Sequence, residues 1–186
     1  MEAQKEKIKT KPKRAVFLDR DGVVNRAIVR GGKPYPPWSL DEFKILPNVM
    51  EACATLKQAG YALVIATNQP DVGRGTLSRN IVEAMHSLIR EELPINRIEV
   101  CYHPGEKLSD CDCRKPLPVM LIRAATELDL DLKQSWMIGD RFSDIECGHA
   151  AGCRTILIGN GYNEAVRISP DFRAENLLEA VTIILN

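Results

Sequence analysis

The sequence has no excess of charge of either sign, because 25 lysines and arginines balance 25 aspartates and glutamates. A neutral chain has no general electrostatic attraction for nucleic acid or for an anionic membrane surface. The chain also lacks any apolar run close to the roughly 18 residues of a membrane span, and no apolar segment of the signal-peptide type lies near its start. We therefore expect a cytoplasmic protein without nucleic-acid or membrane partners.

The length and the distribution of charge predict one domain preceded by a tail. Residues 1–14 are rich in lysine and poor in apolar side chains, which is typical of a disordered basic tail. A nucleic-acid-binding arm is the less favoured alternative, because Glu2 and Glu6 dilute the positive charge. Residues 15–186 are enough to bury a sizeable core without disulfides. We expect a single domain and a monomer.

Short apolar runs alternate with segments of helical periodicity along residues 15–186. Such alternation predicts a parallel sheet with helices on both faces. Asn48 and Ser78 are expected to cap two of the helices. The expected strands are 15–18, 61–66, 98–101, 136–138 and 155–158, and the expected helices are 48–59, 78–92, 118–128, 145–151 and 176–185.

No periodicity is evident from Asn25 to Pro47, where glycines and prolines cluster around Tyr35 and Trp38. Long loops in compact domains are often functional. Because this one follows the first strand directly, we expect it to overhang the carboxyl end of that strand. We find no insertion long enough for a separate cap domain.

The first strand is followed by two carboxylates and a glycine, Asp19-Arg20-Asp21-Gly22. Two carboxylates about 4 Å apart repel by roughly 4 kcal/mol at an effective dielectric near 20, so such a pair favours a bound cation or a shared proton. An ordinary turn is the alternative for this segment taken alone. A calcium-binding EF-hand loop is excluded, because its sixth and twelfth positions hold Val24 and Arg30 instead of Gly and Glu.

Polar residues also follow other predicted strands, namely Thr67 and Asp140. The carboxyl ends of parallel strands meet at one edge of a sheet, where ligands bind. An aspartate there can act as a nucleophile toward phosphorus, and the added negative charge favours Mg²⁺, which prefers oxygen ligands. We expect Asp19, the backbone carbonyl of Asp21 and Asp140 as its ligands.

Four residues have further roles in the predicted phosphoryl site. Thr67 and Lys115 offer hydrogen-bond donors to phosphate oxygens, although each of them seen alone could be a turn residue or a solvated surface cation. Asp21 is expected to protonate the leaving oxygen and then to accept a proton from the attacking water. Asp144, one helical turn after Asp140, is expected to orient Lys115 or to support the metal site.

Three of the six cysteines crowd between Cys101 and Cys113, which favours a metal site over a disulfide framework. Cys101, His103, Cys111 and Cys113 form two pairs, the pattern of a tetrahedral structural Zn²⁺. Free buried thiols beside a surface histidine are the alternative. A zinc ion would brace the loop and fix Arg114 and Lys115, which follow the last ligand.

These residues together resemble the haloacid dehalogenase (HAD) superfamily of phosphatases. The matching motifs are Asp19-x-Asp21-Gly22, Thr67-Asn68-Gln69, Lys115 and Gly139-Asp140-x-x-x-Asp144. The resemblance implies a Rossmann-like fold, Asp19 as nucleophile, Asp21 as acid and base, and Asp140 as a magnesium ligand. It also implies that Thr67 and Lys115 hold the phosphate.

The zinc-type pairs before Arg114-Lys115-Pro116 are similar to the branch of that superfamily containing heptose-bisphosphate and histidinol-phosphate phosphatases. This resemblance implies a small phosphorylated sugar as substrate, with histidinol phosphate as the alternative. Phosphoryl transfer to a second acceptor, or a non-catalytic zinc-braced module, is less favoured. The residues expected to bind substrate are Asn68, Gln69, Arg74, Arg114 and Arg141.

Overall fold

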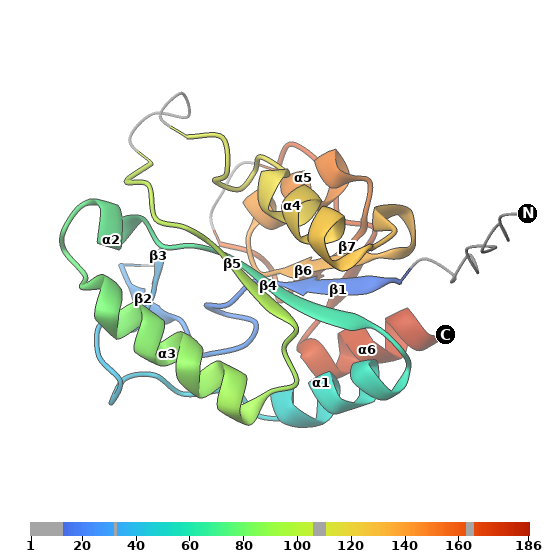
Figure 1. The fold of residues 1–186 in the computed structure, drawn as a ribbon, viewed down its shortest axis with the longest axis horizontal. Coiled ribbons are helices and arrows are strands. Elements are labelled where there is room, and N and C mark those ends of the chain that lie inside the picture. The colour runs from blue at the N-terminus through green and yellow to red at the C-terminus, as the bar shows by residue number, and fades with distance from the viewer. Residues whose placement is uncertain (1–12, 32, 106–110, 163–165) are drawn as a thin grey trace, which may run out of the picture.

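The computed structural model describes residues 13–31, 33–105, 111–162 and 166–186 (Figure 1). Six parallel strands form the main sheet, in the order β5-β4-β1-β6-β7-β8. The strand order reverses around the central β1, as it does in doubly wound α/β folds. The strands are β1 (Ala15–Leu18), β4 (Ala62–Asn68), β5 (Arg97–Cys101), β6 (Trp136–Gly139), β7 (Arg154–Ile158) and β8 (Phe172–Ala174).

Helices cover both faces of this sheet (Figure 1). Strand side chains alternate between faces, so Val16 and Leu18 enter one apolar cluster while Ala15 and Phe17 enter another. The predicted α/β fold is therefore confirmed. On the Val16 face lie α1 (Val49–Gln58), α3 (Arg79–Glu92) and α6 (Leu177–Leu185); on the other lie α4 (Val119–Leu128) and α5 (Phe142–Ala151).

Several short elements were not predicted. The segment expected to be a loop contains a hairpin of β2 (Ile28–Arg30) and β3 (Lys33–Tyr35), and β8 also lies outside the predicted strands. Strands of three residues are too short to show alternation, which explains why the sequence gives no sign of them. A short helix α2 (Pro70–Gly73) and the 3₁₀-helix η2 (Leu132–Gln134) complete the described elements.

Element ends differ from the sequence-based expectation for local reasons. Helix α5 begins three residues early, at Phe142, because Asp144 accepts the Arg141 backbone N–H at 3.1 Å. Neither Asn48 nor Ser78 makes the side-chain cap that the sequence predicts. Asn48 instead adopts a left-handed backbone with φ 65°, a conformation that asparagine tolerates better than most residues.

The predicted tail lies largely outside the described residues, but its last two residues belong to the domain. Lys13 pairs with Leu130, and the Arg14 guanidinium donates to the Ala59 carbonyl at 3.0 Å. It also stacks over the Tyr61 ring, 4.2 Å from the centroid. In the described part of the chain, no helix has the length and apolar character needed to cross a membrane.

From the packing of the central strand β1 we predict how a core substitution changes the free energy of unfolding. Phe17, on β1, is fully buried in the apolar cluster that includes residues of α4 and α5. Phe17→Ala should therefore lower the free energy of unfolding by about 3–5 kcal/mol. Met50→Ala, at a position 55% exposed, should change it by less than about 0.5 kcal/mol. Urea denaturation measures both, and equal effects would contradict the assigned core.

Candidate active site

The carboxyl ends of three neighbouring strands bring predicted site residues together. Asp19 follows β1, Asp140 follows β6 and Thr67 is the penultimate residue of β4, and these strands lie side by side in the order β4-β1-β6. A cavity of about 750 Å³ opens over this edge. Its walls include the predicted residues Asp19, Asp21, Thr67, Asn68, Arg74, Arg114, Lys115, Arg141 and Asp144.

Lys115 is the cation at the centre of this site. Its buried ammonium group donates to Asp19 Oδ1 at 2.7 Å and to the Ala66 carbonyl at 2.6 Å, and it pairs with Asp144 Oδ1 at 2.6 Å. Burial alone lowers the pKa of a lysine, but the carboxylates of Asp144 and Asp19 outweigh it and raise the pKa above its ordinary value. Lys115 therefore remains charged and fixes the Asp19 carboxylate.

The carboxylates crowd one another even with this cation present. Burial, together with the negative charges of Asp144 and Asp21, raises the pKa of Asp19 to about 6 against the attraction of Lys115. The pKa of Asp140 rises to about 8, through burial and then through the charges of Asp19 and Asp144. A cluster that resists ionisation in this way favours a further cation.

The donor set of the cluster fits Mg²⁺. Asp19, Asp140 and Asp144 each place one carboxylate oxygen within 4.8 Å of the others. Among the described residues, the buried Oδ1 of Asp140 has no hydrogen-bond partner, so a ligand-binding lone pair is available. Oxygen atoms are the ligands that Mg²⁺ prefers. The Asp21 carbonyl, expected as a further ligand, stays a prediction.

Two glycines make room for these carboxylates. A Cβ atom at Gly22, whose φ is +103°, would lie 1.8 Å from Asp140 Oδ2, and one at Gly139 would lie 2.2 Å from Asp144 Oδ2. Any other residue would force the carboxylates to move. The glycine after the second aspartate of the motif thus serves both the turn and the close approach of Asp140.

Asp21 lines the same cavity as Asp19, and both residues follow the end of β1 at Leu18. The Arg20 guanidinium donates to both Asp21 carboxylate oxygens, at 3.0 and 2.9 Å. Asn25 Nδ2 donates to Asp21 Oδ1 at 2.9 Å, and Gln69 Nε2 donates to Oδ2 at 2.8 Å. The carboxylate of Asp21 is therefore held at the cavity wall by three side chains.

Asn68, the last residue of β4, and Gln69 after it contact other site residues. Gln69 is fully buried and also donates to the Thr67 hydroxyl at 2.9 Å, and it does not line the cavity. Asn68 accepts the Lys115 backbone N–H and donates to the Lys115 carbonyl, both at 3.1 Å. Their roles in substrate binding stay predictions, while their contacts position Asp21 and Lys115.

Three arginines lie along the cavity wall, at Arg74, Arg114 and Arg141. Burial lowers the pKa of Arg114, and the positive charges of Arg74 and Arg141 act in the same direction, because the three cations lie close together. Arg74 also pairs with Asp71 at 3.2 Å. The absence of a side chain at Gly105 allows Arg114 to pack there, since a Cβ atom would lie 2.6 Å from its Cζ.

Sequence reasoning missed two groups of site residues. The Tyr162 hydroxyl donates to Asp140 Oδ2 at 2.9 Å and lines the cavity; the only sequence signal was its place in a glycine-rich segment after β7. The hairpin contributes Pro34 and Tyr35 to the cavity wall, as expected for a segment that overhangs the end of β1. Their individual contacts could not be predicted without the hairpin.

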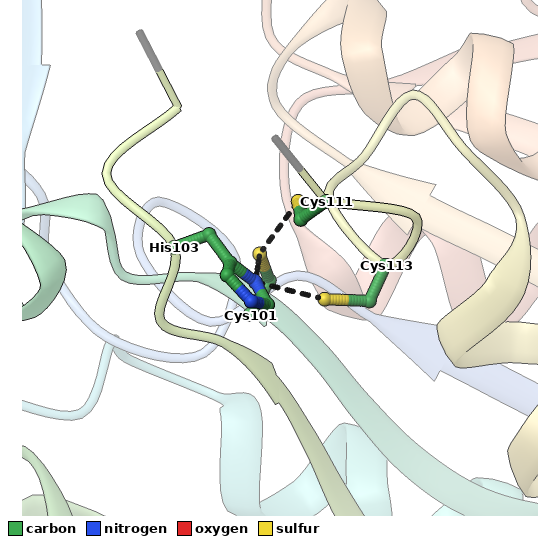
Figure 2. Close-up of side chains that lie close together, drawn as sticks. All are labelled: Cys101, His103, Cys111 and Cys113. Carbon is green, nitrogen blue, oxygen red and sulfur yellow. Dashed lines mark hydrogen bonds between the residues drawn. The ribbon is translucent and has the colours of Figure 1, made fainter. Parts of the chain in front are cut away.

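The four predicted zinc ligands form a separate cluster, shown in Figure 2. The His103 Nδ1 atom lies 3.5 Å from the Cys101 sulfur and 3.4 Å from the Cys113 sulfur, and the sulfurs of Cys101 and Cys111 are 3.7 Å apart. A tetrahedral zinc with ordinary bond lengths would separate sulfur from sulfur by about 3.8 Å and sulfur from nitrogen by about 3.6 Å. The spacing therefore fits a bound zinc.

The protonation of Cys101 agrees with a need for metal. Burial raises the pKa of Cys101 to about 12, so this thiol does not ionise by itself at neutral pH. A metal ion would supply the charge that stabilises the thiolate. Arg114 and Lys115 directly follow the ligand Cys113, so the cluster is covalently connected to the active-site cavity.

Comparison with known proteins places the chain in a family. A family model described as HAD-hydrolase-like matches residues 112–180. D-glycero-beta-D-manno-heptose-1,7-bisphosphate 7-phosphatase of Yersinia pestis is 37% identical over 158 residues, covering 79% of this chain and 81% of that protein. The corresponding D-glycero-D-manno-heptose-1,7-bisphosphate 7-phosphatase of Chlorobaculum tepidum is 34% identical and covers 91% of this chain and 92% of its own.

Solved structures agree with these relatives. The crystal structure of D,D-heptose 1,7-bisphosphate phosphatase from B. bronchiseptica, complexed with magnesium and phosphate, has a TM-score of 0.76 at 30% identity, and the match covers 92% of this chain and 98% of that one. The corresponding enzyme from Burkholderia thailandensis has a TM-score of 0.65 at 28% identity, over 94% and 99% of the two chains. The chain therefore belongs to the HAD-like hydrolases and is a phosphatase.

Proposed function

We propose that the protein is a Mg²⁺-dependent phosphomonoesterase that forms an aspartyl-phosphate on Asp19. Its proposed substrate is D-glycero-D-manno-heptose 1,7-bisphosphate, from which the 7-phosphate is removed. One observation carries the proposal: the buried Lys115 ammonium joins Asp19 and Asp144, and Asp140 places a carboxylate oxygen within 4.8 Å of theirs. The relatives named above support the choice of substrate.

In the first half of the reaction, an Asp19 oxygen attacks the phosphorus and the bond from phosphorus to the sugar oxygen breaks. Lys115 prevents the Asp19 carboxylate from rotating, because its ammonium binds Oδ1 at 2.7 Å. Asp21, at the cavity wall, gives its proton to the departing sugar oxygen. Thr67 offers a hydroxyl to the phosphoryl oxygens from the neighbouring strand.

In the second half, Asp21 takes a proton from a water molecule, which attacks the phosphorus of the aspartyl-phosphate. The bond between phosphorus and Asp19 breaks, inorganic phosphate forms, and the carboxylate is restored. Asp19, Asp140 and the Asp21 carbonyl would hold Mg²⁺, which neutralises charge on the phosphoryl group. Asp144 keeps Lys115 in place through both halves.

The arginines support the choice of a bisphosphate. A second phosphate that does not react needs donors away from Asp19, and guanidinium groups suit phosphate oxygens. Arg74, Arg114 and Arg141 line the same cavity, whose volume of about 750 Å³ is ordinary for a small-molecule site. Histidinol phosphate, the alternative substrate, would bring its amine near these cations and is disfavoured by repulsion.

Hydrolysis is favoured over transfer to a second acceptor. A phosphotransferase has to exclude water from its phosphorylated aspartate. In the described residues, the segment between β1 and α1 contains the β2–β3 hairpin but no separate cap domain. Water can therefore reach the aspartyl-phosphate. We keep a cytoplasmic monomer, expected from the sequence, as part of the proposal.

Zinc binding by Cys101, His103, Cys111 and Cys113 is the structural part of the proposal. The interatomic distances support it, since they match the edges of a tetrahedral zinc site. The proposed effect is to fix Arg114 and Lys115, which follow Cys113 in the chain. Zinc would take no part in the reaction itself.

We expect Asp19→Asn to lower kcat by at least about 10³-fold, because an amide is not a nucleophile toward phosphorus. Asp129→Asn is the matched control: it removes an exposed carboxylate at the end of α4, where the backbone has φ 55°, and should leave kcat unchanged. Phosphate release measures both variants. An active Asp19→Asn protein would refute the covalent mechanism.

Substrate choice predicts a difference in kcat/KM. The heptose bisphosphate should be hydrolysed at least about tenfold more efficiently than histidinol phosphate. Arg114→Gln should raise KM for the bisphosphate about tenfold or more, since a hydrogen-bonded ion pair contributes about 1.5–3 kcal/mol. The exposed Arg90→Gln on α3 is the control. Equal efficiencies for the two substrates would argue against the bisphosphate.

Elemental analysis of protein purified without added metal should find one zinc per chain. Cys113→Ala should lose the zinc and lower the melting temperature, because metal binding stabilises the folded state. Cys153→Ala, which removes a buried thiol outside the cluster, should keep the zinc. Protein without zinc before any mutation would contradict the proposed brace.

A further inference from the structure

A buried arginine separates the two aspartates of the active-site motif. The Arg20 side chain is fully shielded from solvent, although arginine is rarely buried without a partner. Its Nη2 atom donates to both Asp21 oxygens and its Nε atom donates to Oδ2 at 3.1 Å. Asn25 and Gln69 also hold this carboxylate, but Arg20 is the charged group among the three.

Helix α3 supplies the residue behind the guanidinium. His86 is fully buried, and its Nε2 atom lies 3.2 Å from Arg20 Nη1. In the described part of the chain, the Arg20 guanidinium has two hydrogen-bond partners, Asp21 and His86. Asp21 is its sequence neighbour, so His86 is the partner that comes from another element. The position of the guanidinium therefore depends on a residue 66 positions away in the sequence.

The chemistry of the pair determines which atom carries the proton. A guanidinium offers only donors, so His86 Nε2 must accept, and the ring proton lies on Nδ1. Glu83 Oε2 lies 3.5 Å from Nδ1. Burial and the Arg20 charge lower the pKa of His86 to about 4, so the ring is neutral at physiological pH and available as an acceptor.

We propose that Arg20 and His86 are positioning residues for Asp21, with His86 fixing the guanidinium and the guanidinium fixing the carboxylate that serves the leaving oxygen. The inference rests on the proposed function, because it concerns the acid of that reaction. Neither residue touches the substrate. His86 lies on the buried side of α3 and is not among the residues that line the cavity.

A positioning role predicts an effect that depends on the leaving group. The sugar oxygen of an alkyl phosphate must gain a proton as it departs, whereas nitrophenolate departs without one. The value of kcat/KM reports the steps up to that departure. Loss of His86 should therefore reduce kcat/KM for the alkyl phosphate and largely spare kcat/KM for p-nitrophenyl phosphate.

The experiment compares these two substrates in wild type and three variants. His86→Leu removes the acceptor and should lower kcat/KM for the heptose bisphosphate by about tenfold or more, with less than threefold change for p-nitrophenyl phosphate. His86→Gln keeps an acceptor oxygen and should restore most of the loss. Val82→Ala, on the same buried side of α3, should lower stability without changing the ratio between the substrates.

If His86→Leu does not fold, Arg20→Lys replaces it in the experiment. Lysine keeps the charge but cannot hold both Asp21 oxygens, so this variant should show the same selective loss of kcat/KM for the heptose bisphosphate. Equal losses on both substrates in the folded variant, or an unchanged ratio, would overturn the positioning role. A wild-type protein inactive on both substrates would overturn the proposed function and this inference with it. The two failures are therefore distinguishable.

Discussion

The repulsion between carboxylates at the ends of adjacent parallel strands is the constraint on which this site depends. Asp19, Asp140 and Asp144 contribute three acidic groups to one small volume. The Lys115 ammonium forms ion pairs with two of them, Asp19 and Asp144. Burial strengthens both the repulsion and the attraction, because the effective dielectric is lower than in water. The remaining imbalance explains why the pKa values of Asp19 and Asp140 rise and why a divalent cation fits there.

Lys115 is held from several directions at once. Asn68 binds its backbone on both sides, and the proposed zinc cluster ends two residues before it in the chain. A lysine side chain has many rotamers, and fixing it in place costs conformational entropy. Restraining the backbone at Lys115 removes part of the freedom that the ammonium would otherwise have, which links the cysteine loop to the carboxylates.

Much of the fold and part of the site could be predicted from the sequence. Alternating strands and helices indicate the parallel sheet, and the rule that ligands bind at strand ends brings Asp19, Thr67 and Asp140 to one edge, as the structure also places them. Contacts between distant segments could not be predicted in this way. The approach of His86 to Arg20, and of Tyr162 to Asp140, depends on how α3 and the segment after β7 pack, which no local pattern encodes. The hairpin was missed because its strands are only three residues long.

The close approach of Gly22 to Asp140 and of Gly139 to Asp144 has a genetic consequence. Even a single added methyl group would overlap a carboxylate at either position, so no other amino acid preserves the arrangement of the acidic cluster. A missense change at Gly22 or Gly139 would therefore displace a carboxylate of the cluster and lower activity. Damaging natural variants are thus expected at two residues that have no side chain to react.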